Sequence, residues 1–121
     1  MSVTLIIIIG RFLLGLMFII AGARNFIRFQ ERVAFKTNYG FVLPAPLLAL
    51  GFAVQLVAGL SVAFGLWSQW GALALIAFII PATALFHNPL MFPRKDRDLH
   101  LYLLTVNAAL IGACLLVIAL G

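Results

Sequence analysis

The chain alternates between long apolar runs and short polar connections, and four of the runs are long enough to cross a membrane. They extend over about residues 3–23, 45–66, 70–87 and 99–120. One helical crossing of a bilayer takes about 20 residues, so the chain has room for four crossings and short connections. The pattern predicts an all-α fold, an integral membrane four-helix transmembrane bundle that forms a single transmembrane domain over residues 1–121.

Composition supports lipid as the solvent and excludes two kinds of chemistry. Apolar residues make up 65% of the chain and charged residues 9%, whereas soluble domains carry about 25% charged residues. Glu31, Asp96 and Asp98 all lie in the connections, so proton or cation coupling through a carboxylate buried in a span is excluded. The single Cys114 excludes an intrachain dithiol relay.

Proline and tryptophan residues mark the ends of the predicted helices. Pro44 and Pro46 suit a helix start, and Trp67 and Trp70 suit a tight turn at the level of the lipid headgroups. Pro81 removes one backbone hydrogen bond, so it should kink the third helix about one turn before its polar end.

The cations predict the orientation of the chain and its main partner. All of them except Arg11 lie in the first and third connections, and the second connection contains none. By the positive-inside rule, both basic connections face the cytoplasm of a bacterial-type inner membrane and both termini are periplasmic. Cations at these places attract anionic headgroups, so the expected partner is the lipid bilayer, with no nucleic acid.

The first connection has two open interpretations. Over residues 25–41, Phe26, Phe29 and Val33 interleave with arginines and a lysine. This spacing is compatible with a short amphipathic helix on the inner leaflet, and equally with an irregular cytoplasmic loop.

Arg11 is the one charge predicted inside a span. It lies eight residues beyond Val3, or about 12 Å along a helix, which places it well inside the hydrocarbon. Two interpretations remain: the side chain extends outward to the headgroups, or its five donors anchor an anion or a carbonyl group.

Neutral polar residues provide further candidates. Gln55 and Asn107 lie at similar depth, about 13 Å from the cytoplasmic ends of their helices, and we expect them to meet. They act either as interhelical hydrogen-bond partners or, with Arg11, as the polar lining of a pocket for an amphiphile such as a quinone. The cytoplasmic mouth of the bundle gathers Asn25, His87, Asn88 and His100. Two histidines with no further ligand set predict no metal site and favour hydrogen bonding.

Several short segments, taken in order, resemble the DoxX family of four-helix inner-membrane proteins. They are residues 10–15, 21–25, 43–46, 55–60, 84–88 and 107–112. The resemblance implies a link to redox processes, because relatives include the membrane subunit of thiosulfate:quinone oxidoreductase.

The resemblance also implies a set of ligand-binding residues. Those that match the recurring polar sites of the family are Arg11, Asn25, Gln55, His87 and Asn107. Two positions depart from the pattern of the family: Gln55 stands where the family often has a glutamate, and Val106 where it often has a lysine. The loss of both members of a buried ion pair argues against proton-coupled chemistry.

The resulting hypothesis is a redox-associated membrane component that binds a quinone or similar amphiphile within the helix bundle. No nucleophile–base pair, metal set or flavin motif is visible, so the chain is at most the membrane subunit of a quinone-linked oxidoreductase, with no intrinsic cofactor and with catalytic residues unknown. The sequence leaves open whether the chain binds a redox partner protein and whether it forms a homo-oligomer. The alternatives are a small-molecule transporter that acts as a dimer and a lipid-binding or structural membrane module.

Overall fold

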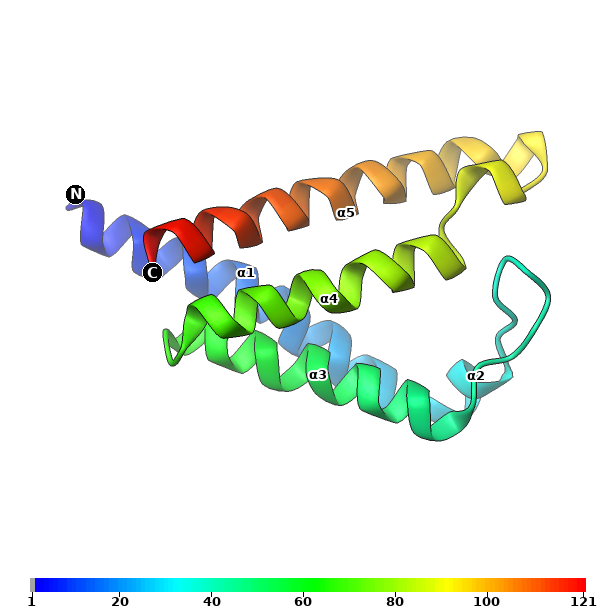
Figure 1. Ribbon diagram of the computed structural model, residues 1–121, viewed down its shortest axis with the longest axis horizontal. Coiled ribbons are helices and arrows are strands. Elements are labelled where there is room, and N and C mark those ends of the chain that lie inside the picture. Colours follow the sequence, from blue (N-terminus) through cyan, green and yellow to red (C-terminus); the bar gives the residue numbers. More distant parts are fainter. Residues whose placement is uncertain (1) are drawn as a thin grey trace.

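The computed structural model describes residues 2–121 and contains four long helices that lie side by side (Figure 1). The long helices are α1 (Val3–Ile27), α3 (Ala45–Phe64), α4 (Ser68–Phe86) and α5 (Arg94–Leu120). Two short elements lie in the longer connections: helix α2 (Phe29–Ala34) and the 3₁₀ helix η1 (Pro89–Met91). All four long helices are long and apolar enough to span a membrane, which confirms the predicted all-α four-helix fold.

The four helices pack in the order of the chain. Helix α1 packs on α3, α3 on α4 and α4 on α5, whereas α1 and α5 make few contacts with each other. Figure 1 shows α4 between α3 and α5. The buried core joins all four helices, through Phe18, Ala58, Val62, Ala72, Leu75, Ile79, Cys114 and Val117.

Glycines allow the closest helix contact, between α1 and α3. A Cβ atom on Gly15 would collide with the main-chain nitrogen of Ala63 and the carbonyl oxygen of Gly59. A Cβ atom on Gly22 would lie 3.1 Å from the backbone nitrogen of Leu56. Small residues let helix backbones approach closely, and the resulting van der Waals packing helps to drive helix association in lipid, so these glycines fix α1 against α3.

The two ends of the bundle differ in charge. At one end, the terminal end, lie both chain termini and the tight turn between α3 and α4 (Figure 1). This turn contains Gly65 and Trp67, both with positive φ angles (71° and 50°). The opposite end, the basic end, holds the two longer connections and all charged side chains except Arg11. Trp67 and Trp70 are 80% and 71% exposed, as expected for residues at a membrane interface.

Two helices are longer than the apolar runs predicted. Helix α1 continues one turn beyond residue 23, so Arg24 and Asn25 are helical, and α5 begins at Arg94 rather than residue 99. Arg97 Nε donates a hydrogen bond to the carbonyl oxygen of Pro89, 3.2 Å away. Charged residues at a membrane edge do not end a helix, because continued helical turns keep the backbone groups paired.

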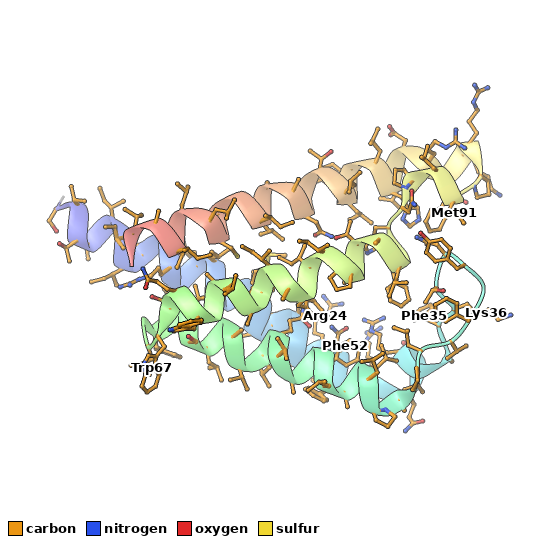
Figure 2. The ribbon with its side chains drawn as sticks, viewed as in Figure 1. Arg24, Phe35, Lys36, Phe52, Trp67 and Met91 are labelled. Carbon is orange, nitrogen blue, oxygen red and sulfur yellow. The ribbon has the colours of Figure 1, made fainter. Side chains whose placement is uncertain are left out.

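The first connection is folded, and neither of its two sequence interpretations describes it fully. Helix α2 has six residues, and the rings of Phe26 and Phe29 pack edge-on against Phe52 of α3, at 5.9 and 6.2 Å between centroids. These apolar side chains therefore face the bundle. In Figure 2, Phe52 and Phe35 lie near this end and Lys36 extends outward.

The rest of that connection docks on the end of α4. The backbone nitrogen of Asn38 donates to the carbonyl oxygen of Leu85 at 2.7 Å, and Asn38 Nδ2 donates to that of Ala84 at 3.3 Å. Carbonyl groups in the last turn of a helix have no partner within the helix. Asn38 thus caps α4 and holds the connection in place.

Candidate functional site

The five predicted ligand-binding residues lie in three separate places. Arg11 is at the terminal end, beside the α3–α4 turn. Asn25 and Gln55 join α1 to α3, and His87 and Asn107 belong to α4–α5 contacts nearer the basic end. The structure therefore does not bring these residues into one pocket.

Arg11 makes only part of the hydrogen bonds available to it. Its Nη1 donates to the hydroxyl oxygen of Ser68 at 3.4 Å and to the carbonyl oxygen of Gly121 at 3.2 Å. Its Nε is buried and has no acceptor in the described part of the chain. The guanidinium lies over Gly65, where a Cβ atom would be 3.2 Å from Nη2, so the absence of a side chain there leaves room for the charge.

The Arg11 guanidinium lies at the level of the α3–α4 turn. Gln55 of α3 lies ten residues before Gly65, or about 15 Å along the helix axis, and the Arg11 guanidinium is beside Gly65. Arg11 is therefore level with the turn and far from Gln55. The sequence prediction counted depth from Val3, and the structure shows that α1 begins beyond the α3–α4 turn (Figure 1).

A chain of polar contacts links α1, α2 and α3. Asn25 Nδ2 donates to Gln55 Oε1 at 2.9 Å, and Arg32 Nε donates to Asn25 Oδ1 at 3.0 Å. Gln55 is 6% exposed, so its side chain is enclosed by the helices. This network holds helix α2 against the bundle and is the interhelical bonding expected of amides in lipid.

Asn107 does not meet Gln55, contrary to the prediction. Its Nδ2 donates to Thr83 Oγ1 of α4 at 2.8 Å. Because α4 separates α3 from α5, residues of equal depth on those two helices face different neighbours. The partner of Asn107 is therefore a threonine that the sequence analysis did not consider.

A cavity of about 310 Å³ lies beside the Asn107–Thr83 pair, between α4 and α5. Its lining is apolar apart from Thr83, Asn88 and Asn107, and the other lining residues are Ile80, Ala84, Pro89, Leu104, Ala108 and Ile111. Ile80 is 56% exposed, and Ala84 and Ala108 are exposed as well. The cavity thus opens sideways, toward the place of the lipid chains.

The polar wall of the cavity offers hydrogen-bond donors. Because the Thr83 oxygen accepts from Asn107, the Thr83 hydroxyl proton is still free to be donated, and Asn107 keeps a second N–H group. Asn88 Oδ1 accepts from the backbone nitrogen of Leu90 at 3.1 Å, which leaves its amide nitrogen as a donor. The arrangement suits a ligand with an apolar body and a carbonyl group.

Two histidines adjoin the basic end of this cavity. His87 precedes Asn88, and the Nδ1 atoms of His87 and His100 are 3.3 Å apart. Phe92 stacks on the His100 ring at 3.4 Å between centroids. One ring nitrogen can donate a hydrogen bond to the other, so the pair links the end of α4 to α5 beside the cavity. Residues 2–121 contain no cluster of three or more metal-ligating side chains.

Sequence reasoning missed the partners of the polar residues rather than the residues themselves. Thr83, Arg32 and Ser68 each complete a contact of a predicted site residue. Thr83 lies one helical turn before His87, a spacing that could have placed it beside the predicted mouth.

Comparison with known proteins supports one family. The model of the DoxX family matches residues 6–88, which is more than half of the chain and includes α1, α3 and α4. The fourth-helix part of the resemblance, with Asn107, lies beyond the matched residues. No curated protein and no solved structure matches the chain. From the family match and the four apolar helices we conclude that this multi-pass membrane protein belongs to the DoxX family.

Proposed function

We propose that the protein binds a quinone or a similar carbonyl-bearing amphiphile in the cavity between α4 and α5, as a redox-associated component of the membrane. The observation that carries the proposal is the cavity itself: about 310 Å³ of space with apolar walls, bounded on one side by Thr83, Asn88 and Asn107. Ligand pockets of proteins typically enclose about 300–1,000 Å³ and combine apolar walls with a few polar groups.

The position of the cavity suits a ligand that arrives from the bilayer. Its sideways opening between α4 and α5 would admit a ring with an attached isoprenoid chain, while the chain stays among the lipids. The ring carbonyl would accept a hydrogen bond from Asn107 or Thr83. The His87–His100 pair beside the cavity would hold a proton near a quinone, which takes up protons when it is reduced.

The chain has no electron carrier of its own under this proposal. Electrons would come from a cofactor-bearing partner protein, and the basic end offers the cations for contact with it. We further propose that the basic end faces the cytoplasm and that both termini face the periplasm, because of the positive-inside rule. Reporter fusions to the two termini would test this orientation: periplasmic activity of both supports it and cytoplasmic activity contradicts it.

The test of quinone binding uses two neighbouring alanines of α5. Ala108 lines the cavity, and Ala109 does not, although both are exposed. Ala108→Phe should fill the cavity, whereas Ala109→Phe adds the same ring to the lipid-facing surface. After extraction in mild detergent, quinone per mole of protein is measured by liquid chromatography and mass spectrometry. Loss of quinone in Ala108→Phe alone supports the proposal, and equal quinone content in the two variants contradicts it.

A further inference from the structure

Arg11 is the one charged side chain at the terminal end, and its hydrogen bonds are incomplete. Among the described residues no aspartate or glutamate lies within ion-pair distance of it, and its Nη1 bonds to Ser68 and to an oxygen of Gly121. Its buried Nε lacks an acceptor. A buried N–H group without a partner costs free energy, so the site favours a ligand that brings an oxygen acceptor and a negative charge.

The space beside Arg11 is a second cavity, which we call the α1–α5 groove. Its volume is about 250 Å³, and Arg11 is the single polar side chain in its lining. The rest of the lining comes from Ile6, Ile7, Gly10 and Leu14 of α1 and from Ala113, Leu116, Val117 and Leu120 of α5. Since Leu116 and Leu120 are 64% and 61% exposed, the groove is open along its side.

The level of the groove within the molecule indicates where the anion would come from. Arg11 bonds to Ser68, which lies between the exposed Trp67 and Trp70, and Figure 2 shows Trp67 extending from the same turn. Tryptophans of this kind lie at the headgroup level. The oxygen anions most abundant at that depth are lipid phosphates, and the planar guanidinium matches phosphate oxygens in pairs.

The size of the groove limits how much of a lipid it holds. Its volume lies below the range of pockets that enclose a whole drug-sized ligand. The groove therefore takes the upper part of one acyl chain beside Arg11, and the remainder of the lipid stays in the bilayer. A quinone fits this site less well, because a single neutral carbonyl oxygen cannot accept the paired, charge-assisted hydrogen bonds that a guanidinium donates to a phosphate.

From this geometry we propose that the α1–α5 groove binds one anionic phospholipid, with its phosphate on Arg11 and one acyl chain along the apolar wall. The site is separate from the α4–α5 cavity and does not depend on the proposed quinone function. Its failure would leave that function untouched, because the two sites share no lining residue and use different stretches of α5, residues 104–111 and 113–120.

The experiment uses phosphatidylglycerol with a photoactivatable acyl chain, in nanodiscs, and the matching phosphatidylcholine as the neutral probe. Crosslinks are mapped by mass spectrometry. We expect phosphatidylglycerol to label residues 6–14 and 113–120 about fivefold more than phosphatidylcholine, the ratio for one arginine acting on an anionic headgroup. This excess should disappear in Arg11→Gln and persist in Arg28→Gln, whose arginine lies at the basic end.

A second pair of variants tests the groove while Arg11 stays in place. A Cβ atom would meet nothing within 4 Å at Gly10 or at Gly112, so both helices accept a larger residue, but only Gly10 lines the groove. Gly10→Leu should reduce the labelling and Gly112→Leu should not. Equal labelling by the two lipids, an excess that survives Arg11→Gln, or displacement of the lipid by added quinone would overturn the proposal.

Discussion

The amide of Asn25 on α1 is bonded directly to that of Gln55 on α3, with Nδ2 2.9 Å from Oε1. Gln55, which the sequence analysis noted as a departure from the family resemblance, is a neutral amide and pairs with another amide. Arg32 bonds to the far side of Asn25, so the contact also fixes helix α2. The pair is a structural joint between helices, remote from the α4–α5 cavity.

This joint predicts a measurable coupling between the two side chains. We expect Asn25→Leu and Gln55→Leu each to lower the free energy of unfolding in lipid, because each removes the hydrogen bond between the two amides. A double-mutant cycle should give a coupling of about 0.6 kcal/mol, and no more than roughly 1.7 kcal/mol. Additive effects of the two substitutions would show that the amides do not interact in the membrane.

The contact between α1 and α3 predicts different responses at two glycines of one helix. Gly15→Ala should destabilise the protein by about 1–3 kcal/mol, because the added methyl group meets the backbone of α3. Gly10→Ala should cost nothing, because a Cβ atom there meets nothing within 4 Å and alanine favours the helix. Thermal unfolding in detergent compares the variants. Equal melting temperatures would mean that α1 and α3 are not packed backbone to backbone.

Asn38 predicts how firmly the first connection is held. Asn38→Ala removes the bond from Nδ2 to the carbonyl oxygen of Ala84, and one such bond is worth about 0.5–1.5 kcal/mol. The amide of Thr37, which donates to the carbonyl oxygen of Phe41, should then exchange with solvent deuterium roughly three- to tenfold faster. The exposed Tyr39 provides the control, since Tyr39→Ala should leave this rate unchanged. Unaltered exchange in Asn38→Ala would rule out the capping role.

Much of the fold could be predicted from the sequence, because it depends on local pattern. Apolar runs of about 20 residues gave the four helices, and Trp67 and Trp70 marked the tight turn. The even number of crossings implied that the two basic connections share one end, and the structure places them together (Figure 1). Helix ends were less predictable, because charged residues such as Arg94 continue a helix beyond the apolar run.

The grouping of the polar residues could not be predicted in the same way. The depth of a residue can be counted along its own helix. Depths on two helices can be compared only when the helices begin at the same level, and α1 and α3 do not (Figure 1). Whether two residues meet also depends on which helices are neighbours, and the sequence did not show that α4 separates Gln55 from Asn107. Arg11 was recognised as a cation without an aspartate or glutamate partner in the spans, but its place beside the α3–α4 turn was not predicted.

The central claim is that an amphiphile with a carbonyl group binds between α4 and α5. The most direct test is labelling with a photoactivatable isoprenoid quinone, followed by peptide mapping. We predict crosslinks within residues 80–89 and 104–111, and their loss when excess unlabelled quinone is added. Labelling that falls elsewhere, or that unlabelled quinone does not reduce, would contradict the claim.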